Sequence, residues 1–401
     1  MDVFIFSKYI FLLPLMLVLL IGSAVYLKRT GRSLNRLTRY ANVVFLVLIL
    51  FDLGMLAKKS FDQPKKTTAV PGGFKDCDSC AKPDIYFIIV DEYAGRYELK
   101  ELFNFDNSPF EKALRQRGFT VVDSSISNYS YTPYSLASIF TMDYLQQIEG
   151  RTWSKKDRQV SYEHINRNRV TSFLRSQGYQ FRNFSVFQFE DQLPLIQSTF
   201  FLAGMDRMTA QTLWSKIDRD IRFNLLTRLG IRSELKSLSD RSVQGVFHLY
   251  DETKKEVTRE SNAPRLIYTH LMMPHYPYLF DKHGNRTPYE MALEGTETKS
   301  KEYLDYLQFA NGKCLQLIDH ILSKSKKPPI IVFMSDHGFR HFEKPVDKKY
   351  YFMNINAVYL PGGNDTSFYK GMSAVNQFRT ILNTQFNQEL PLLKDSTILM
   401  E

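Results

Sequence analysis

The sequence predicts an α/β protein in which helices sandwich a mostly parallel sheet, preceded by a hairpin of two transmembrane helices. Two observations lead to this prediction: helical and strand-like segments alternate after Pro83, and two long apolar runs stand near the N-terminus. The chain has 401 residues, of which 44% are hydrophobic, enough for a membrane segment and one large domain. We expect the hairpin at residues 1–60, a linker with a CxxC pair at 61–82, and the α/β domain at 83–401.

The hairpin is predicted from the apolar runs at residues 9–27 and 40–57, each long enough to cross a bilayer. All charged side chains between these runs are basic: Lys28, Arg29, Arg32, Arg36 and Arg39. By the positive-inside rule this loop is cytoplasmic, so both ends of the hairpin face outward. We therefore expect a multi-pass protein embedded in the lipid bilayer of the cell membrane (the inner membrane in a Gram-negative cell), with its large domain extracytoplasmic.

The positive charge of the chain belongs mainly to this hairpin. The net charge is +10, and the segment up to Lys66 contributes +7 of it, from ten Lys and Arg against three Asp. The remaining +3 does not make a basic face on the large domain, so we expect no nucleic-acid partner. Beyond the hairpin, Cys77 and Cys80 are expected to close a small disulfide in an oxidising exterior.

The large domain shows repeated helix-then-strand units. In residues 108–125 a helical pattern stops at Gly118 and a strand follows, and residues 168–185 repeat this order around Gly178. A long amphipathic helix is expected over residues 300–327. Residues 190–261 are predicted to form a largely helical insertion.

Three apolar runs end in side chains that can bind metal. "KPDIYFIIVDEYAG" ends in Asp91 and Glu92, "RLIYTHLMMPHYPY" ends at His275, and "IIVFMSDHGFRH" ends in Asp336 and His337. In open α/β sheets, ligands bind just beyond the carboxyl ends of the strands. Carboxylates and imidazoles without thiolates suit a divalent cation such as Zn²⁺ or Mn²⁺. The three runs together therefore predict a metal site at one edge of the sheet.

The segment "NYSYTPYSLASIFTM" offers a hydroxyl for this site. Thr132 followed by Pro133 fits an N-cap with Pro at the first helical position, and a capped helix is one interpretation. The other interpretation is a nucleophile at a helix N-terminus, where the helix dipole favours an anion and a divalent cation stabilises the alkoxide. Two further residues have open roles: Glu92 is equally a ligand of a second cation or a solvated neighbour, and His341 is a further ligand or a surface histidine.

Taken together, these motifs resemble the alkaline phosphatase superfamily in its sulfatase-like branch. The opening motif of sulfatases is similar to "PDIYFIIVDEYAG", their nucleophile motif to "TPYSLASIFTM", their substrate-facing motif to "PHYPY", and their metal motif to "SDHG". The resemblance covers roughly residues 83–362 in the family order. It implies that Asp91, Thr132, Asp336 and His337 bind the metal, that Thr132 is the nucleophile, and that His275 faces the substrate. Asn128, near Thr132, is a further candidate for lining the substrate pocket.

Several departures from the sulfatase pattern are informative. The nucleophile position holds Thr132 where sulfatases have Cys or Ser, and the family's Arg and Lys positions hold Leu136 and Val186. An Asp-His pair in the metal motif favours Zn²⁺ or Mn²⁺ over Ca²⁺. These differences make the chain similar to the Thr-dependent members, which include lipoteichoic acid synthases, phosphoethanolamine transferases and nucleotide phosphodiesterases.

The resemblance implies a covalent, two-step hydrolase or phosphotransferase acting on phosphoesters, such as phosphodiesters, lipid headgroups or glycan-linked phosphates. Thr132 attacks phosphorus, and His275 binds or protonates the leaving group. Two alternatives remain at this stage. One is a hydrolase of sulfuric esters on the same fold, and the other is a non-catalytic binding or scaffold protein anchored in the membrane.

Overall fold

The structure is a computed structural model that describes residues 9–31, 34–61, 71–145, 155–190, 192–196, 232–292, 296–363 and 366–400. The chain divides into two compact units, Met1–Thr67 and Thr68–Glu401.

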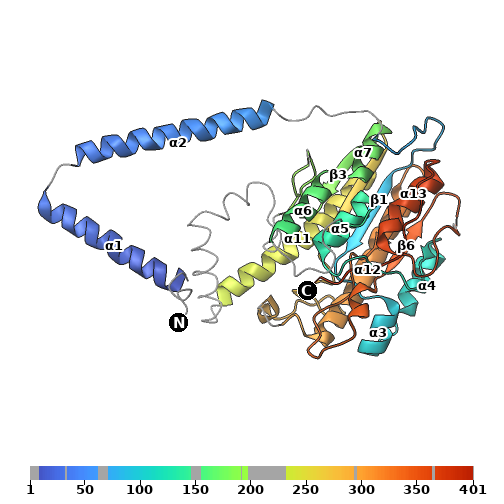
Figure 1. Cartoon of the computed structure of the whole chain (residues 1–401). Helices are drawn as coiled ribbons and strands as arrows, with labels where there is room; N and C mark the ends of the chain where they lie inside the picture. The colour runs from blue at the N-terminus through green and yellow to red at the C-terminus, as the bar shows by residue number, and fades with distance from the viewer. Residues whose placement is uncertain are drawn as a thin grey trace. The chain divides into compact units, whose positions relative to one another are not determined.

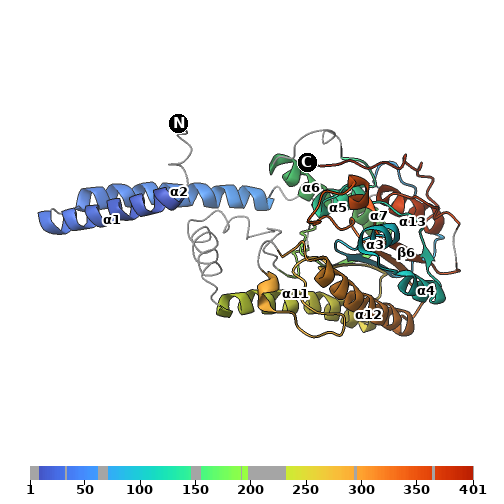
Figure 2. The ribbon, with the colours of Figure 1, turned by 90° about the horizontal axis from the view of Figure 1, so that it is seen from below.

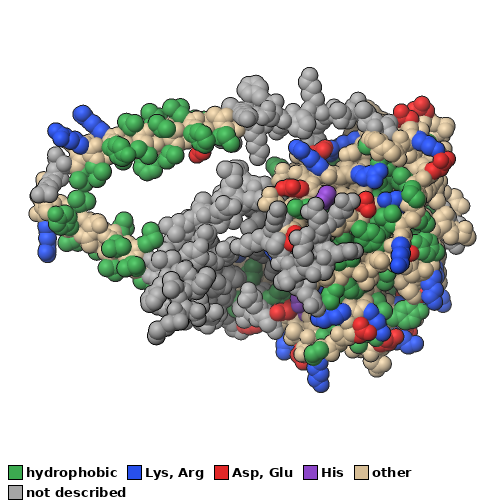
Figure 3. Space-filling model, in the orientation of Figure 1, with side chains coloured by type: hydrophobic (Ala, Val, Ile, Leu, Met, Phe, Trp, Pro, Cys, Tyr) green, Lys and Arg blue, Asp and Glu red, His purple; other side chains and the backbone are tan. Residues whose placement is uncertain are grey.

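The N-terminal unit consists of two helices, α1 (Tyr9–Thr30) and α2 (Asn35–Phe61). Their apolar side chains are exposed, and Figure 3 shows hydrophobic side chains along both helices. Within the described residues one segment, Asn35–Met55, is long and apolar enough to cross a membrane, with a mean hydropathy of 1.6 and no burial. One candidate span is therefore established, and the first span of the expected hairpin stays a prediction.

The second unit is built on a six-stranded sheet in the order β2-β6-β5-β1-β4-β3. β1 runs parallel to both β4 and β5, and β3 runs parallel to β4. β6 is antiparallel to β5, and β2 is antiparallel to β6. The predicted mostly parallel sheet is confirmed, with two antiparallel strands at one side. The strands are β1 (Ile85–Val90), β2 (Thr120–Val121), β3 (Gln180–Phe184), β4 (Arg265–Leu271), β5 (Ile330–Met334) and β6 (Asn356–Tyr359).

Helices cover both faces of this sheet. α5, α7 and α13 pack on one face and α4, α11 and α12 on the other, as Figure 1 and Figure 2 show from two directions. The helices are α3 (Arg96–Phe103), α4 (Ser108–Gln116), α5 (Thr132–Thr141), α6 (Lys155–Asn166), α7 (Arg169–Ser176), α11 (Arg232–Thr258), α12 (Ser300–Lys324) and α13 (Gln377–Gln385). Short 3₁₀ helices are η3 (Tyr289–Ala292), η4 (Lys348–Phe352) and η5 (Ala374–Asn376).

The central strand β1 explains why its sequence is a continuous apolar run. Successive side chains of a strand point to opposite faces, so Phe87 and Ile89 enter one hydrophobic core while Ile88 and Val90 enter the other. Every residue of β1 is buried. A strand covered on both faces needs apolar side chains on both, which is typical of parallel sheets.

The insertion expected at residues 190–261 is described in part. Its C-terminal half contains the long helix α11, which packs against β4 and α12. Residue 191 and residues 197–231 lie outside the described residues.

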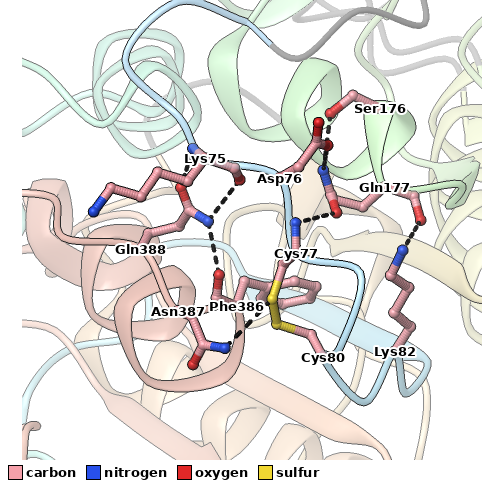
Figure 4. Close-up of a disulfide and its surroundings, with 10 residues drawn as sticks. All are labelled: Lys75, Asp76, Cys77, Cys80, Lys82, Ser176, Gln177, Phe386, Asn387 and Gln388. Atoms are coloured by element: carbon pink, nitrogen blue, oxygen red, sulfur yellow. Dashed lines mark hydrogen bonds between the residues drawn. A yellow bond between two sulfur atoms is a disulfide. The ribbon is translucent and has the colours of Figure 1, made fainter.

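The segment before β1 is held by a disulfide between Cys77 and Cys80, whose Cα atoms are 5.5 Å apart. Around it, the backbone N–H of Cys77 donates to the side chain of Gln177, and the amide of Gln388 bonds the backbone of Lys75 (Figure 4). The linker thus joins the domain beside the last residue of α7, close to where the parallel strands begin.

A buried acid lies in the loop and helix that follow β1. Glu98, in α3, is fully buried, and its Oε2 lies within 2.6 Å of the position that a Cβ on Gly338 would occupy. Burial raises the pKa of Glu98 well above its usual value, and the nearby charge of Glu92 adds to the rise. Burial therefore favours the neutral form of Glu98 in the folded domain.

This buried acid makes stability depend on pH. Because the folded state keeps a proton that the unfolded state releases above about pH 4.5, the contribution of Glu98 to the free energy of unfolding falls as pH rises. The slope reaches up to about 1.4 kcal/mol per pH unit until the pKa of the folded state is reached. We expect Glu98→Gln to remove this fall in the free energy of unfolding with rising pH. The measurement is denaturant unfolding from pH 5 to 8, roughly the range above the reference pKa of a glutamate. Exposed Glu163→Gln is the control, and an unchanged slope in Glu98→Gln would show that Glu98 is ionised in the fold.

Candidate metal centre and active site

Three predicted ligands meet at the carboxyl ends of two neighbouring strands. Asp91 follows β1 and Asp336 and His337 follow β5, and all three side chains are fully buried. Their candidate ligand atoms all lie within 4.8 Å of one another. Because β1 and β5 are adjacent and parallel, both strands deliver their last residues to the same edge.

Thr132 joins this group from the first turn of α5. Its Oγ1 lies 3.2 Å from Nε2 of His337 and 3.5 Å from Oδ1 of Asp91. The expectation that Thr132 is the N-cap is wrong by one residue: Tyr131 has the extended cap conformation, and its carbonyl accepts the first helical bond, from Ser135. The Thr132 hydroxyl is therefore free of a capping role and faces the carboxylates.

The loop after β5 fixes the tautomer of His337. Its Nδ1 lies 2.8 Å from the carbonyl oxygen of Gly338, which can only accept, so Nδ1 carries the proton. Nε2 is left with a lone pair directed at Thr132. The hydroxyl of Ser335 donates to the carbonyl of His337 at 2.7 Å and accepts from the backbone N–H of Tyr93 at 2.9 Å, which ties the two loops together.

A second group lies beside the first and contains Glu92, His275 and His341, whose candidate ligand atoms also lie within 4.8 Å of one another. Glu92 Oε1 is 3.3 Å from Nε2 of His341, and Glu92 Oε2 is 3.7 Å from Nε2 of His275. The backbone of Glu92 has a φ of 57°, an unfavourable conformation for a residue with a side chain. Such outliers cluster at functional sites, where the surrounding structure holds them in place.

Neighbouring histidines lower the pKa values of two acids of the site, Asp91 and Glu92. Burial raises the pKa of Asp91, but His275 and the hydrogen bond from His270 outweigh burial and hold this pKa well below its usual value. Burial likewise raises the pKa of Glu92, and His341 and His275 reverse the shift. The buried edge of the sheet therefore concentrates negative charge.

The two histidines of the second group are shifted in opposite directions. Burial lowers the pKa of His275, but Asp91 and Glu92 outweigh it and raise this pKa above its usual value. The charge of Glu92 raises the pKa of His341, but burial and Arg340 prevail and lower it. Two neighbouring histidines with pKa values shifted in opposite directions are typical of sites where one group acts as an acid and the other as a base.

The donor set fits a divalent cation. Asp336 Oδ2 and Glu92 Oε2 are buried without a hydrogen-bond partner among the described residues. An ionised, unpaired carboxylate oxygen away from water is costly unless a cation or a donor faces it. Carboxylates and an imidazole with a free Nε2 are ligands that Zn²⁺ and Mn²⁺ accept. The residues of the first group could therefore hold such an ion.

The structure also identifies a contact that sequence reasoning missed. His270 lies within β4 and looks like a core histidine, yet its Nε2 is 3.2 Å from Asp91 Oδ2 and its Nδ1 is 2.9 Å from the hydroxyl of Tyr268. The register that places His270 opposite Ile89 of β1 explains this contact, and no local motif signals it. His270 therefore orients the carboxylate of Asp91.

Asn128 is not brought to this site. Its Nδ2 donates to the Tyr144 hydroxyl at 3.0 Å and to the Ser396 carbonyl at 2.9 Å, and its Oδ1 accepts from the backbone N–H of Val375 at 2.6 Å. Both ends of the amide are thus used to anchor the C-terminal segment. The geometry gives no support to the prediction that Asn128 binds substrate.

Gly338 allows the loop after His337 to pass close to its neighbours. A Cβ at this position would lie 2.5 Å from the carbonyl oxygens of both Met353 and Tyr350. The backbone N–H of Gly338 donates to the carbonyl of Tyr351 at 2.9 Å. Because Gly338 has no side chain, the metal motif can pack directly against the segment around η4.

The family model described as Sulfatase matches residues 87–379, more than half of the chain. The chain therefore belongs to the Sulfatase family, which confirms the predicted place in the sulfatase-like branch of the alkaline phosphatase superfamily. Its fold is that of a sulfatase-like hydrolase or transferase. No curated protein matches the sequence.

Several solved structures are similar in fold. The C-terminal periplasmic domain of EcEptC from Escherichia coli is 14% identical, with a TM-score of 0.49, and the match covers 83% of this chain and 94% of that one. The putative sulfatase yidJ from Bacteroides fragilis is 12% identical, with a TM-score of 0.47 and coverage of 78% and 76%. Lipooligosaccharide phosphoethanolamine transferase A (EptA) from Neisseria meningitidis is 12% identical, with a TM-score of 0.45 and coverage of 94% and 67%. At such identities the activities of these proteins do not transfer to this chain.

The close approach at Gly338 predicts that Gly338→Ala is destabilising. Two backbone carbonyls must move, and overpacking of this kind typically costs about 1–3 kcal/mol. The matched control is Gly312→Ala in α12, where a new Cβ meets nothing within 4 Å. Because alanine is the better helix former, the control should gain about 0.5–1 kcal/mol. Both are measured by denaturant unfolding, and equal effects of the two substitutions would contradict the packing argument.

Proposed function

We propose that this chain is a membrane-anchored, metal-dependent hydrolase or phosphotransferase that acts on phosphoesters through Thr132. The observation that carries the proposal is the placement of the Thr132 hydroxyl. It begins helix α5 without capping it and points at Asp91 and His337. A threonine that served only the helix would direct its oxygen at the backbone N–H groups of the first turn.

Asp91, Asp336 and His337, with Thr132, would hold the cation. A bound Zn²⁺ or Mn²⁺ would stabilise the Thr132 alkoxide and the charge that develops on the phosphoryl oxygens. Zinc and manganese suit this mixed carboxylate and imidazole set better than Ca²⁺, which prefers oxygen ligands alone.

The chain's own groups support a two-step reaction. The Thr132 hydroxyl donates toward Asp91 Oδ1, so its proton has an acceptor as the oxygen attacks phosphorus and the bond to the leaving oxygen breaks. His275 donates its Nδ1–H to the carbonyl of Tyr276. Asp91 and Glu92 raise its pKa and so favour the imidazolium form, in which Nε2–H can donate a proton to the leaving oxygen. Water or an alcohol then displaces Thr132 from phosphorus and completes the turnover.

The preference for phosphoesters over sulfate esters rests on two core residues. Leu136 and Val186 occupy the positions of the sulfatase Arg and Lys, and both are buried in the hydrophobic core beneath α5. Neither position can present a cation to a sulfate. A sulfuric ester hydrolase is therefore the second candidate on this fold.

The non-catalytic scaffold is disfavoured by the cost of the site. Three buried carboxylates, one of them on the strained backbone of Glu92, lower stability, and a scaffold gains nothing from them. An enzyme needs such groups to bind a cation and to stabilise developing charge.

The location in the cell follows from α2 and the basic loop before it. We infer a membrane protein whose domain lies outside the cytoplasm, with a phosphoester on a lipid, a glycan or a soluble molecule as its substrate. The Cys77–Cys80 disulfide supports this side of the membrane, because disulfides persist in oxidising compartments.

Substitution of Thr132 tests the nucleophile. Thr132→Ala should fold and bind metal but lose turnover of an aryl phosphodiester by orders of magnitude, since the covalent path is gone. Thr132→Ser should retain part of the activity because it keeps the hydroxyl. Intact-mass analysis after rapid quenching should find a phosphoryl adduct on the peptide containing Thr132 in the wild type.

The control for this experiment is Thr141→Ala, at the last residue of the same helix, whose hydroxyl bonds only helix carbonyls. Its turnover should stay near that of the wild type. A folded Thr132→Ala protein with wild-type turnover would rule out Thr132 as nucleophile. Faster turnover of aryl sulfates than of phosphodiesters would favour the sulfatase alternative.

Removal of metal tests the cation. We expect a chelator to abolish turnover and to lower Tm, because the buried carboxylates then lose their counter-charge. Re-addition of Zn²⁺ or Mn²⁺ at about 1,000 times Kd should restore about 4 kcal/mol of stability. Calcium should restore less.

The matched pair for the metal experiment is Asp336→Asn and Asp319→Asn. Asp336 is buried in the first group, whereas Asp319 is half exposed and pairs with Arg117 on the surface. The first variant should lose the metal-dependent rise in Tm and the second should keep it. Turnover that persists in verified metal-free protein would exclude a metal-dependent mechanism.

A further inference from the structure

Arg340 lies beside the site, two residues after Gly338. Its guanidinium carbon lies 4.0 Å from the ring centroid of Tyr131, the residue directly before Thr132. Its Nε lies 3.7 Å from Oε1 of Glu92, and its backbone N–H donates to the same oxygen at 3.3 Å. With its side chain only 15% exposed, Arg340 is a cation held between the nucleophile loop and the second group.

The guanidinium has unused capacity for hydrogen bonds. A separation of 3.7 Å is too long for a hydrogen bond, and the Nε of Arg340 is buried without a partner. Within the described residues, the side chain of Arg340 donates no hydrogen bond. A guanidinium offers five donors in a planar fork that matches two oxygens of a phosphate. Arg340 is thus oriented by Tyr131 and Glu92 and still able to bind an oxyanion.

Arg340 also changes the charge balance of the second group. The geometry of the second group would allow it to bind a cation through Glu92, His275 and His341. A divalent ion there would lie close to the guanidinium of Arg340, which is already beside Glu92. The two positive charges would repel each other in a largely buried space. The guanidinium therefore occupies the role that a second ion would have.

We propose that Arg340 binds the non-bridging oxygens of the substrate's phosphoryl group in place of a second metal ion, and so selects singly charged phosphodiesters. This inference rests on the proposed function of the site. Arg340 and one divalent cation would face an edge of the sheet at which Asp91, Glu92 and Asp336 are buried. A monoester dianion brings one more negative charge to this edge than a diester does, and it is therefore the costlier of the two to bury.

The test uses the metal-loaded full-length protein and three variants. Arg340→Met removes both the charge and the planar set of hydrogen-bond donors, whereas Arg340→Lys keeps only the charge. Arg117→Met is the control and removes a surface arginine that pairs with Asp319. KM and kcat are measured for an aryl phosphodiester and the matching monoester. Binding of dimethyl phosphate is measured by calorimetry in the Thr132→Ala background, where no nucleophile is present, and bound zinc is counted by mass spectrometry.

We expect about one zinc per chain in the wild type. Charge-assisted hydrogen bonds of this kind support a loss of roughly tenfold to hundredfold when they are removed. Arg340→Met should therefore raise KM for the diester and weaken dimethyl phosphate binding by that factor, with a smaller loss in kcat. Arg340→Lys should recover part of the binding, Arg117→Met should change nothing, and the wild type should favour the diester over the monoester.

The outcomes separate this inference from the proposed function. Arg340-dependent binding of dimethyl phosphate without any phosphoester turnover would support the inference and contradict the proposed function. Thr132-dependent turnover with unchanged KM and unchanged dimethyl phosphate binding in folded Arg340→Met would overturn the inference alone. Two zinc ions per wild-type chain would also overturn it, because a second ion would then hold the place assigned to Arg340.

Discussion

Mutual repulsion of three buried carboxylates is the constraint around which this domain is organised. Asp91, Glu92 and Asp336 are fully buried at one edge of the sheet, where the cationic or titratable side chains beside them are histidines and Arg340 among the described residues. The strands deliver these acids to one place because β1 and β5 are parallel neighbours. The surrounding groups stabilise this concentration of negative charge. His270 orients Asp91, and the Ser335 hydroxyl links the two loops that carry the acids. Two histidines and Arg340 lie beside Glu92.

The sequence allowed the central strands and the residues at their exits to be predicted because that information is local. A covered parallel strand is an uninterrupted apolar run, and β1, β4 and β5 each have one, so their positions follow from the residues alone. The helix-stopping glycines, Gly118 and Gly178, mark the ends of two helices for the same reason. Both have a positive φ, which glycine adopts without steric cost.

The remaining features depend on contacts between distant parts of the chain. The antiparallel direction of β6 is decided by how the chain returns after η4, and its four residues read no differently from a parallel strand. The contacts of His270 and Asn128 could not be predicted from the sequence because a residue type does not identify its partner. The register of β4 carries His270 to Asp91, and the C-terminal segment occupies Asn128. Arg340 escaped notice because its position over Tyr131 requires two loops separated by about half the chain.

The loss of the sulfatase cations also has a packing explanation. Leu136 and Val186 lie in the hydrophobic core and carry no charge, so in the proposed function the charge that recognises an oxyanion must come from elsewhere. Arg340 enters from the loop after β5, on the same side as the metal motif. In the proposed function, the same short segment of chain would bind the metal and recognise the substrate.

The linker fixes where the domain is tethered. The Cys77–Cys80 loop bonds Gln177, before β3, and Asp84 bonds the first residue of β4, so the chain enters at the amino ends of the strands. The reactive edge is at the opposite ends, one strand length or about 20 Å away. The point where the linker joins the domain and the candidate metal centre are therefore at opposite ends of the same strands.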